Sequence, residues 1–154
     1  MYSWFECKIT YDRTGDDGLI KTVKETYLVD AQSFTEAEAR ITLEMKPFIS
    51  GDFTVANIRR IKVGEMFDSQ DANADRWYRS KVNFISLDED KGVEKRIAST
   101  MFIKAADMEG ALRNLLEGMK TTLADYEIAS ISETSILDVY EYAPIDEADV
   151  RDDD

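Results

Sequence analysis

The sequence predicts an α+β fold made by tandem internal duplication of a strand-strand-helix-strand unit, with two pseudo-symmetric halves packed as one body. The stretch "SWFECKITY" at residues 3–11 is echoed by "RWYRSKVNF" at residues 76–84. The match continues at an offset of 73 residues (Trp4 to Trp77) or 74 residues (Ala31 to Ala105), and the offset changes only where loops are expected. Repeats of this length indicate one supersecondary unit used twice.

Each half begins with two predicted strands. Side chains of the first strand alternate between two faces, as a half-buried strand requires. The apolar face is expected to carry Phe5, Cys7, Ile9 and Tyr11. The polar turns "RTGDDG" and "DEDKG" follow and predict hairpins, and the second strands are "KETYLVDA" and "ASTMFIKAA".

A helix is predicted next in each half. Ser33 and Glu36 fit a capping box, in which the Ser oxygen accepts a free backbone N–H and the Glu reaches back. Asp107 occupies the matching position and is also a good N-cap. Apolar residues at spacings of three and four place one stripe on each helix: Phe34, Ala37, Ile41 and Met45, and then Met108, Ala111, Leu115 and Met119.

The third strands, "FTVANIRRIKV" and "YEIASISETSI", change their alternation midway, which predicts a bulge in both. A short fourth strand is expected through 66–67 and again through 139–140. The predicted organisation is a first repeat at 1–67, a linker at 68–75, a second repeat at 76–142 and an acidic C-terminal tail at 143–154.

The composition narrows the class of protein. The formal net charge of −13 disfavours direct nucleic-acid binding, which depends on Lys and Arg neutralising phosphates. No apolar stretch approaches the ~20 residues that span a bilayer, and the N-terminal residues do not resemble a signal peptide. We therefore expect a cytoplasmic protein without a membrane partner.

The chain contains no histidine and one cysteine, Cys7. These counts exclude a Ser-His-Asp or Cys-His arrangement and a zinc site made from His or several Cys. Neither a phosphate-binding loop nor a dinucleotide-binding fingerprint is present. We predict a protein that is not an enzyme, with no catalytic residue, no metal site and no cofactor. A carboxylate-based metal-dependent enzyme is the alternative.

Five residues are candidates for ligand or partner binding: Trp4, Lys8, Trp77, Arg79 and Lys81. Each Trp falls on the polar face of its strand together with a Lys. In one interpretation the Trp side chains cap the core edge or are buried between the halves. In the other, aromatic and ammonium groups form two equivalent sites for an anionic, nucleotide-like ligand. Arg59 and Arg60 have no basic counterpart in the second half.

The stretches "WFECKITY", "YLVDAQSFTEAEARI", "GDFTVANI", "ADRWYRSKV" and "DYEIASISETSILDVY" together resemble a known family. Its members are small proteins of unknown function encoded by Bacteroidota and by their phages and mobile elements. The resemblance runs from Met1 to about Tyr142. It implies an intracellular bacterial or phage setting, and it transfers no catalytic residue because the family has no established activity.

The leading hypothesis is a non-enzymatic binding or interaction protein. Exposed sheet edges or Trp-bearing faces would bind a protein partner or close a homodimer. The alternatives are a phage-type sink for a small anionic nucleotide, an acidic mimic of nucleic acid that occupies a basic host protein, and a virion or assembly component.

Overall fold

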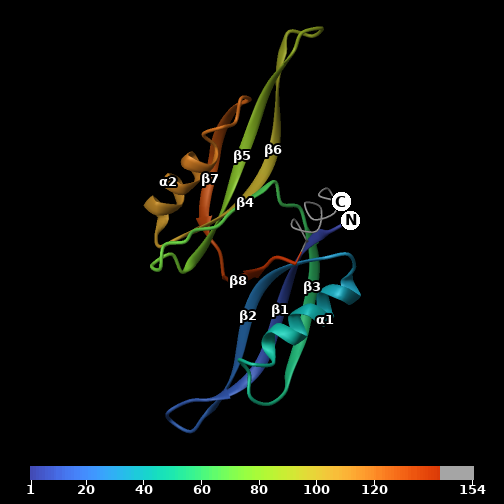
Figure 1. The fold of residues 1–154 in the computed structure, drawn as a ribbon, viewed down its shortest axis with the longest axis vertical. Coiled ribbons are helices and arrows are strands. Elements are labelled where there is room, and N and C mark those ends of the chain that lie inside the picture. Colours follow the sequence, from blue (N-terminus) through green and yellow to red (C-terminus); the bar gives the residue numbers. More distant parts are fainter. Residues whose placement is uncertain (143–154) are drawn as a thin grey trace, which may run out of the picture. The chain divides into compact units, whose positions relative to one another are not determined.

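The computed structural model describes residues 1–142, so the predicted acidic tail lies outside the described residues. Within them the fold is α+β, as predicted, with two helices and two four-stranded sheets (Figure 1). The elements in chain order are β1 (Ser3–Thr14), β2 (Ile20–Ala31), α1 (Phe34–Met45), β3 (Phe53–Ile61), β4 (Glu65–Phe67), β5 (Arg76–Asp88), β6 (Val93–Ala105), α2 (Met108–Gly118), β7 (Asp125–Glu133) and β8 (Ile136–Tyr140). No helix in the described part of the chain is long and apolar enough to cross a membrane.

The first sheet has the strand order β3-β1-β2-β8, and the second has the order β4-β6-β5-β7. The long strands β1, β2 and β3 are antiparallel, as are β5, β6 and β7. The short strands β4 and β8 pair in parallel with β6 and β2. Each sheet therefore has one short edge strand and one edge strand of nine residues, β3 or β7.

The chain forms two compact units that do not follow the ranges of the sequence repeat. Among the described residues, unit 1 consists of Met1–Ile61 and 136–142, and unit 2 is Lys62–Ser135. The difference from the predicted ranges 1–67 and 76–142 arises because β4 pairs with β6 and β8 pairs with β2. Each fourth strand thus leaves the unit that its preceding strand belongs to. The packing of the halves as one body stays a prediction.

The strands of the two units pair in matching registers. Phe5 lies opposite Val29 in unit 1, and Tyr78 lies opposite Ile103 in unit 2. The register between the first and third strands shifts after Lys8 and again after Lys81, which confirms the predicted bulges. The predicted short fourth strands are also present as β4 and β8.

Both helices begin at the predicted caps. Ser33 Oγ accepts the N–H of Glu36 at 3.1 Å, and Asp107 Oδ1 accepts the N–H of Gly110 at 2.7 Å. Glu36 reaches back to the N–H of Gln32 at 2.8 Å, one residue before the cap. These bonds satisfy N–H groups that a helix start leaves without intrahelical partners.

Each helix packs on one face of its own sheet (Figure 1). On the predicted core face of β1, Tyr11 is half-buried and the other three residues are buried. Of the predicted helix stripes, Phe34 and Met108 are an exception: they are 48% and 47% exposed, because the first turn of each helix lies at the margin of the core. The core of unit 1 contains Phe5, Cys7, Ile9, Tyr27, Val29, Ala31, Ala37, Ile41, Met45 and Ile49. In unit 2 the buried residues that pack with α2 include Tyr78, Val82, Met101, Ile103, Ala105, Ala111, Leu115 and Met119. Within residues 1–142, no helix packs on the opposite face of either sheet.

Candidate binding surfaces

The candidates Trp4 and Lys8 lie on the helix-free face of β1, in unit 1. Trp4 is half-buried and stands opposite Asp30 and Ile61 in the neighbouring strands. Lys8 is exposed. Their shared face agrees with the predicted parity, and their role in ligand binding stays a prediction.

The candidates Trp77, Arg79 and Lys81 lie on the helix-free face of β5, in unit 2. Arg79 and Lys81 are exposed, whereas Trp77 is buried with 3% of its surface accessible. The Trp77 indole Nε1 has no hydrogen-bond partner among the described residues. Trp77 is therefore less accessible to solvent than the half-buried Trp4, although the two residues occupy equivalent positions of the repeat.

The basic residues Arg59 and Arg60 contact neighbours within unit 1. Arg59 Nη2 lies 3.2 Å from Glu6 Oε1. The Arg60 guanidinium lies 5.4 Å from the ring centres of both Phe5 and Phe34, within the range of a cation–π contact. These contacts cover the end of β3 with charged side chains.

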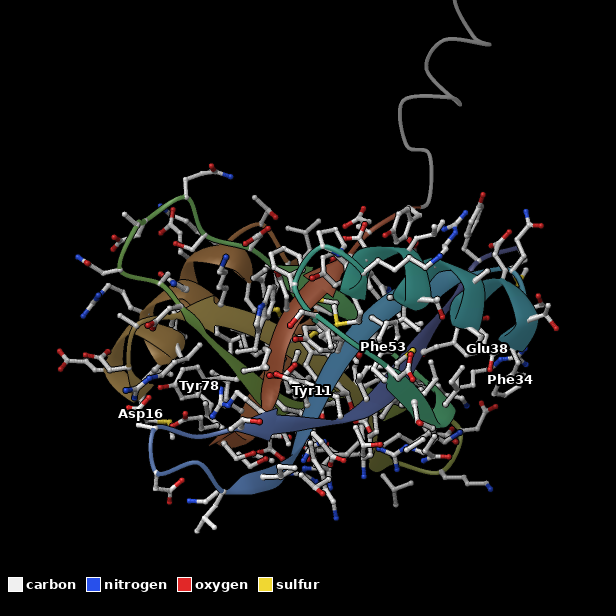
Figure 2. All side chains as sticks on the ribbon, turned by 90° about the horizontal axis from the view of Figure 1, so that it is seen from below. Tyr11, Asp16, Phe34, Glu38, Phe53 and Tyr78 are labelled. Carbon is white, nitrogen blue, oxygen red and sulfur yellow. The ribbon has the colours of Figure 1, made fainter. Side chains whose placement is uncertain are left out.

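A groove of about 700 Å³ lies between α1 and β3. Figure 2 shows Glu38 on α1 and Phe53 on β3, the two elements that border it. The lining residues are Thr35, Glu38, Ala39, Thr42, Leu43, Lys46, Phe53, Thr54 and Val55. Its lining combines apolar side chains with the charged side chains of Glu38 and Lys46. We call it the α1/β3 groove.

The α1/β3 groove follows a sheet edge. Within residues 1–142, β3 pairs only with β1, so the other side of β3 presents backbone N–H and C=O groups that no strand of the described chain covers. Ala56 is the extra residue of the bulge, because Asn57 stands opposite Lys8 and Val55 opposite Ile9. A bulge and charged side chains are devices that blunt an edge strand. Here they occupy the second half of β3 and leave Phe53–Val55 beside the groove.

Tyrosine hydroxyls surround a carboxylate on the helix-bearing face of unit 1. Tyr11 and Tyr27 donate to the two oxygens of Glu25 at 3.0 and 2.9 Å, and the Tyr27 ring stacks on Tyr140 with centroids 6.0 Å apart. Burial and the Glu25 bond raise the pKa of Tyr27 far above its ordinary value. Burial and nearby carboxylates, Asp138 foremost, raise the pKa of Tyr140 to about 12. These phenols keep their protons near neutral pH, so they act there as hydrogen-bond donors and not as proton-transfer groups.

Tyr11 also borders a second hollow, of about 460 Å³. Its walls come from the end of β1 and from the segment after α1. The lining residues are Tyr11, Asp12, Arg13, Thr14, Phe48, Ile49 and Ser50. This hollow is polar, and it lies beyond the end of α1.

Arg40 on α1 joins several segments of unit 1. Its Nη1 donates to the Asp30 carbonyl at 2.9 Å, and its Nη2 lies 3.4 Å from the Glu36 carboxylate. The guanidinium lies 4.4 Å from the Tyr142 ring centre and 5.6 Å from that of Tyr2. The Asp30 carboxylate, 3.5 Å from Arg40, also accepts the backbone N–H of Tyr142. We call these five residues the Arg40 cluster. Its contacts connect α1 with the end of β2, with Tyr2 and with Tyr142, so its role is structural.

The candidate reactive groups of residues 1–142 include the carboxylates and the Cys7 thiol. Within residues 1–142, no three Asp, Glu, Cys or His side chains gather closely enough to hold a metal ion. Burial, with the Glu6 carboxylate beside it, raises the pKa of the Cys7 thiol to about 12. A thiol with such a pKa is a poor nucleophile near neutral pH.

The chain was compared with curated proteins and with models of protein families. A comparison with curated proteins finds no match. A family model described as a domain of unknown function, DUF4494, matches residues 3–142, a range that contains every helix and strand of the described residues. The chain therefore belongs to the family of proteins that carry the domain of unknown function DUF4494.

Proposed function

We propose that this protein is a non-enzymatic binding protein that captures an extended segment of a partner polypeptide at the edge of a sheet. The observation that carries the proposal is the α1/β3 groove, which runs beside the uncovered side of Phe53–Val55. An added strand would bond to the backbone of β3, while alternate side chains would enter the groove. Backbone bonds supply affinity in this mode of recognition, and the groove supplies selectivity.

The groove lining favours a segment of mixed polarity. Leu43 is 65% exposed, and Phe53 and Val55 are half-buried. Glu38 and Lys46 contribute one charge of each sign to the lining. A bound segment would therefore place an apolar side chain over Leu43, Phe53 and Val55, and polar side chains beside the two charges.

The proposal also concerns the origin of the two units and the cell in which the protein acts. We propose that units 1 and 2 arose by duplication, which is supported by the equal registers of their strands and by the offset repeat in the sequence. The family resemblance supports a cytoplasmic setting in Bacteroidota or in cells infected by their phages. The partner would then be another protein of the host or of the phage.

A peptide selection tests the proposed function. Peptides of about ten residues would be selected from a random displayed library against the full chain, and their affinities measured by fluorescence anisotropy. Ala39→Arg fills the groove from an exposed position of α1, and Ala72→Arg adds the same charge at an exposed position of the predicted linker. Selected peptides should bind Ala39→Arg at least about tenfold more weakly and Ala72→Arg normally. Equal binding to both variants would contradict the proposal.

A further inference from the structure

Unit 2 contains an uncovered edge that corresponds to the edge of unit 1. Among the described residues, β7 pairs only with β5, so its other side faces no strand. Its first half, Asp125–Ile128, precedes the bulge, just as Phe53–Val55 does in β3. The helix beside it is α2. We call this surface the α2/β7 edge.

The helix beside this edge exposes an apolar stripe. Met108, Leu112 and Leu116 follow one another at intervals of four residues, which places them on one side of α2. They are 47%, 41% and 47% exposed. At the offset of 74 residues, Leu112 and Leu116 correspond to Glu38 and Thr42, which line the α1/β3 groove. Apolar side chains thus replace a carboxylate and a hydroxyl beside the edge of unit 2.

The first half of β7 separates two kinds of side chain by face. Tyr126 and Ile128 pack against the core that α2 covers. Asp125 and Glu127 point to the helix-free face, because side chains alternate along a strand, and both are exposed. Glu127 already accepts hydrogen bonds from Arg96 Nε at 2.8 Å and from Asn83 Nδ2 at 3.3 Å. The edge is therefore apolar on its helix side, and on its other side it carries Asp125 next to the Glu127–Arg96 ion pair.

We propose that the α2/β7 edge captures an extended segment whose side chains alternate between apolar and basic. This inference rests on the strand-addition mode of the proposed function and applies it to a second edge. Apolar residues of the segment would contact Leu112, Leu116 and Ile128. An intervening basic residue would stand beside Asp125, where opposite charges on neighbouring strands attract.

The charge of β7 disfavours a second copy of β7 as the occupant. An antiparallel pair of two β7 strands centred on Ala129 would bring Asp125 of each copy opposite Glu133 of the other. Like charges directly opposite each other destabilise strand pairs. A basic segment removes this repulsion, and the net charge of −13 adds a long-range attraction for it.

The test uses a synthetic peptide of eight residues that alternates Val and Lys. Two control peptides contain the same Val and Lys residues in two blocks, or alternate Val and Glu. Binding to the full chain is measured by fluorescence anisotropy. The alternating Val/Lys peptide should bind at least about tenfold more tightly than either control. Equal binding of the block peptide would show attraction by charge alone and would overturn the inference.

Matched variants locate the binding. Leu112→Gln with Leu116→Gln should weaken the Val/Lys peptide by about tenfold, because both side chains lie in the proposed contact. Leu87→Gln changes an exposed leucine near the end of β5, 63% exposed and so no less accessible than the other two, and should leave binding unchanged. Circular dichroism of each variant checks that it remains folded. Unchanged binding of the Leu112/Leu116 variant would overturn the inference.

Backbone methylation distinguishes strand addition from other modes. Successive N–H groups of a strand point to opposite sides, so N-methylation at every second residue of the peptide either removes all of the hydrogen bonds that the peptide donates to β7 and places methyl groups against β7, or does neither. N-methylation of one set of alternate residues should abolish binding, and N-methylation of the other set should preserve it. Equal effects of the two sets would overturn the inference.

Failure of this inference is distinguishable from failure of the proposed function. If library peptides bind the α1/β3 groove but the Val/Lys peptide does not bind the α2/β7 edge, only the inference falls. Suppose instead that the Val/Lys peptide binds, that only one of the two N-methylated sets abolishes its binding, and that Ala39→Arg weakens no library peptide. The inference then stands, and the proposed site on unit 1 falls.

Discussion

Units 1 and 2 pair their strands in the same register, yet different side chains surround their helices. In unit 1, Tyr11 and Tyr27 donate to Glu25. The corresponding residues of unit 2 are Phe84, Met101 and Ser99. Both units keep the apolar alternation that determines strand pairing, so the backbone arrangement tolerates the change. The comparison shows that one framework supports a polar helix flank in one unit and an apolar flank in the other.

A second contrast concerns the bond from each helix to the preceding strand. Arg40 donates to the Asp30 carbonyl at 2.9 Å, and Asn114 donates to the Lys104 carbonyl at 3.0 Å. Arg40 and Asn114 are equivalent at the offset of 74 residues. The backbone contact is thus shared. Arg40 adds ion pairs with Asp30 and Glu36 and contacts with two tyrosine rings, which form the Arg40 cluster.

The largest expected effect separates these two positions. Arg40→Ala removes a partly buried guanidinium beside the buried Asp30 and should lower the free energy of unfolding of unit 1 by about 3 kcal/mol. Asn114→Ala removes a single hydrogen bond and should cost unit 2 about 1 kcal/mol. Each unit contains one Trp, so urea unfolding followed by fluorescence in a Trp77→Phe or Trp4→Phe background monitors one unit. Equal losses would contradict the comparison.

The next effect concerns a glycine in α2. A Cβ at Gly118 would lie 2.5 Å from the Phe67 ring, so Gly118 lets β4 approach the helix closely. Gly118→Ala should destabilise unit 2 by about 1–2 kcal/mol, although the change favours an isolated helix by about 1 kcal/mol. Adding Phe67→Ala should remove the clash, so urea unfolding of the double variant should show strong non-additivity. Additive losses would refute the contact.

Much of the fold could be predicted because short-range patterns determine it. Period-two alternation identified β1 and β5, and the caps at Ser33 and Asp107 identified the helix starts. The short strands β4 and β8 were also predicted. Their pairing with β6 and β2 was not, because strands of three and five residues carry too little pattern to specify a partner.

The candidate site could be predicted only in part. The repeat drew attention to Trp4 and Trp77, and the structure places them on the predicted faces. The α1/β3 groove was missed, because its width depends on the distance between a helix and a strand edge and not on a motif. One signal was available for unit 2. Leu112 and Leu116 are apolar where the first repeat has polar residues.

Alkaline pH provides the third test of the comparison. The pKa of Tyr140 is about 12 in the folded protein, against an ordinary value of 10. A folded pKa above the unfolded value means that the stabilisation is complete below pH 10 and is lost as the pH rises from 10 through 12. Trp4 fluorescence should show loss of unit 1 in this range, and absorbance should follow tyrosine ionisation. Earlier loss of unit 2 would contradict the assignment.

The smallest expected effect is an exchange of the two helix caps. Ser33→Asp and Asp107→Ser should each change the free energy of unfolding by less than about 0.5 kcal/mol, because Ser and Asp are similarly effective N-caps. Ser33→Ala and Asp107→Ala serve as controls and should each cost about 1 kcal/mol. A large loss from either exchange, measured by urea unfolding, would show that the two helix starts are not equivalent.

Hydrogen–deuterium exchange of the full chain, with and without a peptide selected from the library, tests the central claim most directly. The claim is that a partner segment adds to the edge of β3. The outward N–H groups of Phe53–Val55 should exchange rapidly in the free protein and become protected when the peptide binds, along with weaker protection in α1. Tight peptide binding that leaves β3 exchange unchanged would contradict the claim.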